Sequence, residues 1–178
     1  MKFLSKFLKL SVICVSLFIL PCCNCEKAQI SQQETSEAPV KKKLVVVNVA
    51  DQDTYNECHI KGSAQLDFDK VENVFADVDR DTPIVTYCAN YQCSASGAVA
   101  QMLKDMGFTN VKAFEAGMAE WYQKGLPVEG NCMHQDKKSV SPYLIAENVK
   151  HDDEQDNDIV IISIDQLKSE MEQAGLLA

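Results

Sequence analysis

Arginine is almost absent from the chain, in which Arg80 is the only one among 178 residues. The chain has 17 basic and 26 acidic side chains and a formal net charge of −9. Nucleic-acid binding needs clustered positive charge that replaces phosphate counterions, so this composition argues against a nucleic-acid partner. The chain also has almost no side chains that could bind an anion through two parallel hydrogen bonds. Arginine offers such a fork, whereas lysine offers only a point charge.

A membrane-spanning length of apolar sequence is missing near the N-terminus. Residues 10–20 (LSVICVSLFIL) form an uncharged stretch of only eleven residues, preceded by Lys2, Lys6 and Lys9. A positive segment followed by an apolar stretch of this length is typical of a secretory signal. We therefore predict an exported protein.

The residues that follow, Pro21-Cys22-Cys23, resemble the lipobox in which a bacterial lipoprotein carries its acylated cysteine. Cys23 is the preferred lipidation site and Cys22 the second choice, because proline is a poor small residue before Cys22. This predicts a lipoprotein-like signal peptide at residues 1–22, a polar flexible tether at residues 23–43, and a periplasmic or lipid-anchored domain. Ordinary cleavage nearby and an uncleaved membrane anchor are the alternatives.

C-x2-C pairs are missing among the four cysteines of the predicted folded part, which are Cys58, Cys88, Cys93 and Cys132. Their irregular spacing argues against a zinc site, so we expect no metal and no other cofactor. In an oxidising compartment four cysteines allow three full disulfide pairings, and the sequence does not choose among them.

Short apolar runs rich in β-branched residues alternate with segments whose apolar positions recur every three or four residues. The pattern predicts strands at residues 44–49, 64–68, 83–88 and 110–114, helices at residues 69–78, 94–106 and 119–124, and a short helix or turn at residues 51–57. Alternating strands and helices indicate βαβ units. The expected fold class is therefore α/β, an open parallel sheet flanked by helices.

Five motifs in this region resemble the rhodanese homology domain, in family order and at normal spacing. They are residues 58–64 (CHIKGSA, where the family often has G-H-I-P-G-A), 83–88 (PIVTYC), 107–111 (GFTNV), 115–121 (EAGMAEW, where the family has x-G-G-x-x-x-W) and 125–128 (GLPV). The resemblance places a rhodanese-like domain at residues 44–130. It implies a single-domain sulfurtransferase.

Cys88 stands where the resemblance implies the sulfur-carrying cysteine. It ends a predicted buried strand, at the sheet edge where open α/β proteins bind ligands. Backbone N–H groups of residues 89–94 and the start of the next helix favour a thiolate there and, after attack on a sulfane sulfur, a persulfide anion. The expected substrate-binding loop is Ala89, Asn90, Tyr91, Gln92 and Ser94. A buried structural cysteine is the alternative.

The loop departs from the family pattern C-x-x-G-x-R-S, because Tyr91 replaces the glycine and Cys93 replaces the arginine. We expect poor activity with thiosulfate, since this anion loses its bidentate partner. Phosphatases of related architecture require C-x5-R, and Ser94 at that position argues against phosphatase chemistry. Cys93 has two interpretations: a resolving thiol that attacks the Cys88 persulfide and releases hydrosulfide, or a small apolar residue in the first helical turn.

Three residues of the other motifs also receive interpretations. The resemblance implies that His59 organises the loop after the first helix, rather than acting as a general base. Cys58 is either a buried thiol or a partner of Cys132. Trp121, the only tryptophan, is expected to pack the last helix onto the sheet.

The resemblance does not extend into residues 131–178, which form a C-terminal extension. Residues 131–158 are polar and include an acidic run, which predicts a flexible solvated linker. Residues 159–162 predict a strand, and Ser163 with Gln166 predicts a capping box that begins a helix. A unit of this size cannot bury a core alone, so we expect it to dock on the main sheet or on a partner.

Three functions are open from the sequence. The first is a sulfurtransferase that takes sulfur from a small donor as a Cys88 persulfide and passes it to a thiol acceptor, with Cys93 as a resolving thiol. The second is a non-catalytic binding module with a static Cys88–Cys93 disulfide and an unidentified protein partner. The third is a thiol–disulfide oxidoreductase, for which the usual C-x-x-C is missing.

Overall fold

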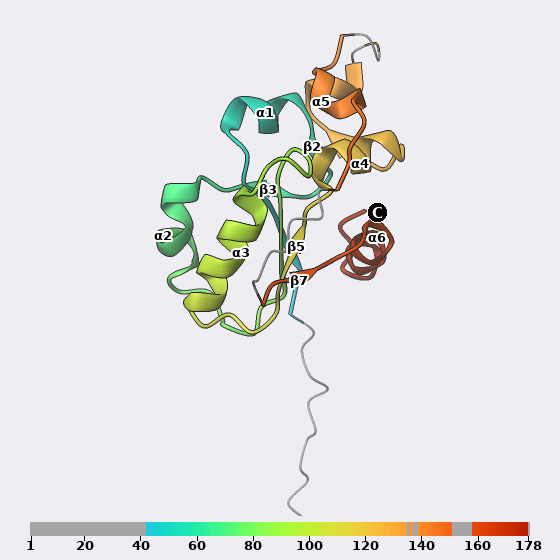
Figure 1. Ribbon diagram of the computed structural model, residues 1–178. Coiled ribbons are helices and arrows are strands. Elements are labelled where there is room, and N and C mark those ends of the chain that lie inside the picture. Colours follow the sequence, from blue (N-terminus) through green and yellow to red (C-terminus); the bar gives the residue numbers. More distant parts are fainter. Residues whose placement is uncertain (1–41, 135, 137–138, 151–157, 178) are drawn as a thin grey trace, which may run out of the picture. The chain divides into compact units, whose positions relative to one another are not determined.

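The computed structural model describes residues 42–134, 136, 139–150 and 158–177, which all belong to one compact unit, Pro39–Ala178 (Figure 1). The predicted signal peptide with Cys22 and Cys23, nearly all of the predicted tether, and most of the acidic run lie outside the described residues. Among the helices of the described ranges, none has the length and apolar character needed to cross a membrane.

Strands and helices alternate along most of the described chain, so the expected α/β class is confirmed. The elements are β1 (Val45–Asn48), α1 (Gln52–Glu57), β2 (His59–Ile60), β3 (Ala64–Gln65), η1 (Phe68–Lys70), α2 (Val71–Phe75), β4 (Ile84–Tyr87), α3 (Ala95–Asp105), β5 (Val111–Phe114), α4 (Gly117–Gln123), β6 (Val128–Glu129), η2 (Asn131–His134), α5 (Pro142–Ile145), β7 (Val160–Ile161) and α6 (Ile164–Gln173). The η elements are 3-10 helices.

The main sheet has five strands in the order β3-β1-β4-β5-β7, and every neighbouring pair is parallel. β4 lies in the middle, with Val85 opposite Val46 of β1 and Lys112 of β5. All four residues of β4 are buried, as its apolar, β-branched sequence requires. A second, two-stranded sheet pairs β2 with β6 in antiparallel fashion, and the sequence did not predict it.

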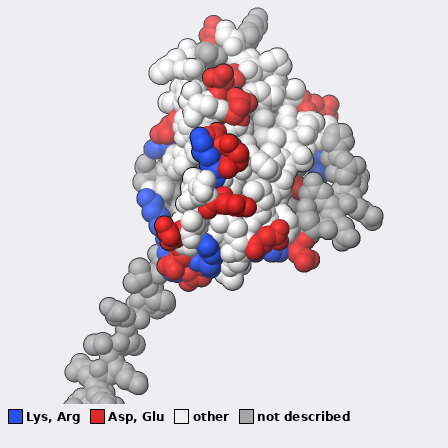
Figure 2. All heavy atoms as spheres, turned by 90° about the vertical axis from the view of Figure 1, so that its left-hand side faces the viewer, with Lys and Arg blue, Asp and Glu red and all other residues white. Residues whose placement is uncertain are grey.

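The side chains of the central strands alternate between two hydrophobic clusters, one on each face of the sheet. The cluster on the α2 and α3 side includes Ile84, Val99 and Leu103. The other cluster includes Val85 and Tyr87 together with residues of α4, α5 and α6. Figure 1 shows α2 and α3 on one side of the sheet and α4 and α6 on the other. Seen from the α2 side, acidic and basic side chains are interspersed and form no large basic patch (Figure 2).

The helix predicted at residues 69–78 is much shorter in the structure, where α2 ends at Phe75. Val71 and Phe75 are buried, one helical turn apart, but Val74 is 55% exposed. The Arg80 guanidinium donates hydrogen bonds to the carbonyl groups of Phe75 and Ala76 at 2.8 and 3.1 Å. These bonds satisfy carbonyls that would otherwise continue the helix, so the chain can leave it early.

The prediction of a flexible solvated linker is wrong for the described part of residues 131–150. This part contains η2 and α5, and it buries Cys132, Val140 and Leu144 in the cluster around α4. Cys132, Val140 and Leu144 are irregularly spaced, so they form neither a helical nor a strand period. Their burial depends on tertiary contacts alone.

The strand and helix at the end of the chain dock on the main sheet, which settles the alternative left open by the sequence. β7 pairs with β5, and the Ile162 N–H donates to the Ala113 carbonyl at 2.9 Å. The predicted capping box of α6 is confirmed by reciprocal hydrogen bonds between Ser163 and Gln166. Leu167 and Met171, on the inner face of α6, are fully buried in the cluster that also contains Val85 and Tyr87.

Candidate active site

The carboxyl end of β4 positions Cys88. The residue follows Tyr87 directly and is only 3% exposed. Its side chain packs in the cluster on the α3 side, with Val99 and Ala100 of that helix. Cys88 therefore lies at the carboxyl edge of the central strand, as the sequence predicted, and this is the edge at which parallel sheets bind ligands.

The loop after Cys88 folds back so that Cys93 reaches it. Asn90 makes the turn: its carbonyl oxygen accepts a hydrogen bond from Cys93 N at 3.1 Å, and its side-chain oxygen accepts one from Gln92 N at 3.1 Å. Cys88 and Cys93 are joined by a disulfide, with Cα atoms 6.1 Å apart. The eleven-residue helix α3 begins two residues later at Ala95, so its N-terminus lies next to the pair.

Gly117 allows α4 to approach the loop. Its φ angle is +61°, and an added Cβ would lie 2.5 Å from the Cys88 carbonyl oxygen. This close approach lets Met118 N donate to the Cys88 carbonyl and Ala119 N donate to the Ala89 carbonyl, both at 2.9 Å. Glycine is therefore required at this position of the EAGMAEW motif, because any side chain would push α4 away from Cys88.

Asn148 is a residue of the site that the sequence gave no reason to select. It lies after α5, in the C-terminal extension, and its side-chain oxygen accepts a hydrogen bond from Tyr91 N at 3.2 Å. Its side-chain nitrogen donates to the Ala116 carbonyl at 2.8 Å. One side chain therefore connects the middle of the loop to the residue that precedes α4.

The loop N–H groups of Tyr91, Gln92 and Cys93 are all bound to asparagine oxygens in this disulfide form. The sequence predicts that the N–H groups of residues 89–94 surround the sulfur, but these three point to Asn90 or Asn148 instead. Of the predicted loop residues, Ala89, Asn90 and Tyr91 are half-buried, and Gln92 and Ser94 are exposed. The structure thus shows a closed loop with these donors already paired.

Two acidic residues act electrostatically on the side chain of Tyr91. Burial raises the pKa of its hydroxyl, and the carboxylates of Glu120 and Glu115 raise this pKa further. The loop contains no lysine or arginine between Cys88 and Ser94. Arg80 is held elsewhere, with its guanidinium 4.5 Å from the centre of the Phe108 ring. The only arginine of the chain is therefore not part of the loop.

Tyr87 fixes the strand end that carries Cys88. Its buried hydroxyl accepts a hydrogen bond from Ile60 N at 3.0 Å and shares one with the Ser63 hydroxyl at 2.8 Å. Burial raises the pKa of Tyr87 to about 12, so the hydroxyl stays protonated at neutral pH. The sequence did not indicate this contact, because its partners lie 27 and 24 residues away.

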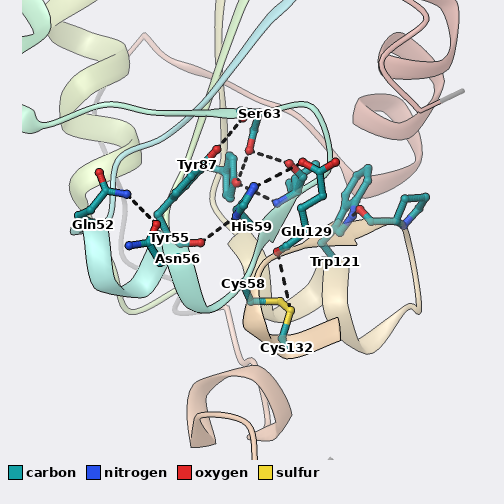
Figure 3. A network of polar contacts seen from close by, with 12 residues as sticks. Gln52, Tyr55, Asn56, Cys58, His59, Ser63, Tyr87, Trp121, Glu129 and Cys132 are labelled. Atoms are coloured by element: carbon teal, nitrogen blue, oxygen red, sulfur yellow. Dashed lines mark hydrogen bonds and ion pairs between the residues drawn. A yellow bond between two sulfur atoms is a disulfide. The ribbon is translucent and has the colours of Figure 1, made fainter. Parts of the chain in front are cut away.

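His59 makes its contacts with α1 and β6 (Figure 3). Its Nδ1 lies 2.8 Å from the Tyr55 carbonyl oxygen, and its ring stacks on the Tyr55 ring with centroids 3.8 Å apart. Its Nε2 lies 3.5 Å from a Glu129 carboxylate oxygen. The polar contact and the ring stacking hold His59 against α1, and its Nε2 faces β6, so its contacts are with the framework of the fold.

A second disulfide joins Cys58, at the end of α1, to Cys132 in η2, with Cα atoms 5.4 Å apart (Figure 3). Of the three pairings that the sequence allowed, the structure has this one together with Cys88–Cys93. Trp121 is fully buried, edge-on to Phe114 of β5, so the expectation that it packs α4 onto the sheet is confirmed. No group of three or more potential metal ligands occurs within the described residues.

Comparison with known proteins gives the family. A family model described as "Rhodanese-like domain" matches residues 31–124. The thiosulfate sulfurtransferase GlpE of Coxiella burnetii is 34% identical over 93 residues, which cover 52% of this chain and 85% of that protein. GlpE of Pseudomonas fluorescens is 32% identical over 88 residues, which cover 49% and 79%.

Among solved structures, the BH2092 protein from Bacillus halodurans is 28% identical in sequence and superposes with a TM-score of 0.48, covering 53% of this chain and 69% of that one. The family model matches more than half of the chain, at the residues that form β1 to α4. The protein therefore belongs to the family of rhodanese-like domains.

Proposed function

We propose that the protein is a rhodanese-like sulfurtransferase that carries sulfane sulfur as a persulfide on Cys88, with Cys93 as the resolving thiol. The observation that supports this most strongly is the disulfide between the two residues at the carboxyl end of β4. It puts a second thiol within bonding distance of the residue that the family resemblance implies as the sulfur carrier. Relatives named thiosulfate sulfurtransferase support the reaction class.

The reaction starts from the reduced loop. The Cys88 thiolate attacks the sulfane sulfur of a donor, the donor's S–S bond breaks, and the rest of the donor leaves with the electron pair, as a thiolate or, from thiosulfate, as sulfite. The product is a Cys88 persulfide anion. The N-terminus of α3 next to the loop stabilises this anion and the preceding thiolate.

Two fates follow for the persulfide. An acceptor thiolate can take the outer sulfur and leave Cys88 as a thiolate. Alternatively, the Cys93 thiol passes its proton to the outer sulfur of the persulfide, the resulting thiolate attacks Cys88 Sγ, hydrosulfide leaves with the electron pair, and the Cys88–Cys93 disulfide forms. Two reductant thiols then restore the dithiol by exchange, so each such turnover releases one hydrosulfide and oxidises two thiols to one disulfide.

The loop lacks the bidentate cation that a compact dianion such as thiosulfate requires. Cys93 stands where the family pattern has arginine, and Glu115 and Glu120 place negative charge near Tyr91. A low-molecular-weight or protein persulfide needs no bidentate cation, whereas thiosulfate does. We therefore propose a persulfide as the donor class and a thiol as the acceptor class.

The test is intact-mass spectrometry of the reduced full chain after treatment with thiosulfate, inorganic polysulfide or glutathione persulfide. We expect Cys93→Ser to accumulate one extra sulfur on Cys88, and the unmodified chain to proceed to the disulfide with release of hydrosulfide. A chain that takes up no sulfur and keeps its disulfide in the presence of thiols would instead indicate a binding module. A chain that exchanges its disulfide with protein thiols, without sulfur uptake, would indicate an oxidoreductase.

We also propose that the chain is exported and anchored by lipid at Cys23 or Cys22. The positive and apolar segments before these residues support export, and so do two disulfides, which persist in oxidising compartments. A labelled fatty acid fed to cells should mark the protein, and the label should disappear when both cysteines are replaced by serine. An unlabelled mature protein that begins elsewhere would contradict the anchor, and the two single variants identify the acylated residue.

A further inference from the structure

A segment outside the family match lies against the active loop. We call residues 139–150 the C-terminal strap. The strap is fixed near its start, where Ser141 donates from its N–H and its hydroxyl to the two carboxylate oxygens of Glu57 at 2.8 and 2.7 Å. Leu144 in its middle is fully buried against the α4 side of the core.

The strap is fixed a second time just before it reaches the loop. Gln123, the last residue of α4, donates from its side-chain nitrogen to the carbonyl oxygens of Leu144 and Ala146 at 3.2 and 2.8 Å. Asn148 follows two residues later and makes its two hydrogen bonds, to Tyr91 N and to the Ala116 carbonyl. Asn148 is thus presented from a fixed segment, and its amide has little freedom to rotate away.

Tyr91 lies between Cys88 and Cys93 in the sequence, so its backbone position affects the distance between the two sulfur atoms. The Asn148 amide ties Tyr91 to Ala116, and the neighbouring α4 residue Met118 binds the Cys88 carbonyl. Both ends of the reacting segment are therefore held to the same part of the molecule. Restricting the loop in this way raises the effective concentration of Cys93 at Cys88, because less conformational entropy is lost when the sulfurs join.

We infer that Asn148 is a positioning residue, through which the C-terminal strap holds the loop in the geometry that lets Cys93 form a disulfide with Cys88. The inference rests on the proposed function only for its consequence in sulfur transfer, namely that Asn148 speeds release of hydrosulfide from the Cys88 persulfide. The equilibrium part stands by itself. In a glutathione buffer, two protein thiols and one glutathione disulfide give one protein disulfide and two glutathione molecules, and Asn148 shifts this equilibrium toward the protein disulfide.

The experiment compares the unmodified full chain with Asn148→Ala in glutathione buffers of graded composition, with thiols trapped by alkylation and counted by mass spectrometry. Asn148→Ala removes two neutral hydrogen bonds, and because only the one from Tyr91 N is made to the loop, the equilibrium constant for the Cys88–Cys93 disulfide should fall by roughly three- to tenfold. Asn148→Asp keeps an acceptor for Tyr91 N but loses the donor to Ala116. Its equilibrium constant should lie between those of the unmodified chain and Asn148→Ala.

Ser141→Ala is the matched control, because it removes the hydroxyl bond to Glu57 but keeps the Ser141 N–H bond to Glu57 and the two Gln123 bonds that fix the strap just before Asn148. The equilibrium constant of this variant should stay within about twofold of the value for the unmodified chain. Urea unfolding at pH 7 reports any general loss of stability. An unchanged equilibrium constant in Asn148→Ala, or an equal shift in Ser141→Ala, would overturn the inference.

A second readout separates this inference from the proposed function. After one loading with glutathione persulfide, Asn148→Ala should acquire sulfur at the normal rate and release hydrosulfide several-fold more slowly. If the unmodified chain acquires no sulfur, the proposed function fails, and the glutathione equilibrium still tests Asn148. If sulfur transfer proceeds and Asn148→Ala matches the unmodified chain in both readouts, the inference fails and the proposed function stands.

Discussion

The two disulfides of this protein differ in the length of chain that they close and in their exposure to solvent. Cys58 and Cys132 are 74 residues apart in sequence and are 0% and 4% exposed. Cys88 and Cys93 are five residues apart, and Cys93 is half-exposed at the carboxyl edge of the sheet. A buried bond that closes a long loop restricts the unfolded chain strongly, whereas a partly exposed bond in a short loop is open to attack by a small thiol. The first is suited to stability and the second to chemistry.

The largest effect should come from Cys88→Ser. We expect this variant to lose sulfur uptake from every donor, because serine cannot hold a sulfane sulfur as a persulfide, and to keep the fold, because serine is close to cysteine in size. Mass spectrometry of treated protein measures the loss, and circular dichroism reports the fold. Full turnover by Cys88→Ser would remove Cys88 from the mechanism.

The control for Cys88→Ser is the double variant Cys58→Ser, Cys132→Ser, assayed at a temperature where it is folded. It lacks the buried disulfide and should keep sulfur uptake. If this double variant lost uptake as completely as Cys88→Ser, the division of roles between the two disulfides would be wrong.

The second effect is on the free energy of unfolding. Here removal of Cys58–Cys132 should have the larger effect and removal of Cys88–Cys93 the smaller one. The chain-entropy relation gives about 4 kcal/mol for a closed loop as long as that of Cys58–Cys132, and about 2 kcal/mol for one as short as that of Cys88–Cys93. The double serine variants of each pair, unfolded in urea without reductant, measure both values. A larger loss from the Cys88–Cys93 pair would show that the loop contributes more to the fold than its position suggests.

A third effect concerns the charge at position 93. Cys93→Arg supplies the guanidinium of the family pattern, and charged hydrogen bonds to thiosulfate should stabilise its attack by about 1–3 kcal/mol, or roughly 5- to 150-fold in the rate of first sulfur uptake. Cys93→Ser is the matched control, since it also lacks the resolving thiol but has no charge. Uptake from glutathione persulfide should be similar in both. If arginine and serine gave equal rates with thiosulfate, the poor match to this donor would come from Glu115 and Glu120 or from Tyr91.

The sequence predicted the central part of the fold well because its signals are local. The apolar runs of β1 and β4 and the periodic face of α3 lie within a few residues of their observed bounds. Cys88 could be placed because a strand end is visible in the sequence. The motif that contains Gly117 was recognisable, although the reason for the glycine, contact with the Cys88 carbonyl, required the structure.

Contacts between distant residues could not be predicted. Asn148 forms hydrogen bonds with Tyr91, 57 residues away in the sequence, and with Ala116, 32 residues away. A single asparagine in a polar segment forms no pattern that would indicate these contacts. The pairing of the cysteines was also beyond the sequence, since three arrangements fit it equally. For the same reason the apolar residues of the C-terminal strap were interpreted as part of a solvated linker.

The smallest effect should come from Tyr87, whose hydroxyl links the strand before Cys88 to Ile60, two residues after Cys58. Tyr87→Phe leaves the buried Ile60 N–H without its acceptor and should cost about 1–3 kcal/mol in urea unfolding at pH 7. Sulfur uptake by Cys88 should not change, because α4 still holds the Cys88 carbonyl. Tyr55→Phe removes a hydrogen bond from a partly buried hydroxyl and should cost less.

The pH dependence of stability gives a separate check on Tyr87. Its pKa is raised from 10.0 to about 12 in the folded protein, so folding disfavours its ionisation. The stability that this group contributes is complete below pH 10 and is lost as the pH rises from 10 toward 12. Tyr87→Phe should therefore show a shallower loss of stability across that interval than the unmodified chain. An equally steep loss would assign the alkaline sensitivity to the partly buried tyrosines Tyr55, Tyr91 and Tyr143, whose pKa values burial also raises. A loss of sulfur uptake would show that Tyr87 acts on the Cys88 loop as well as on the strand before it.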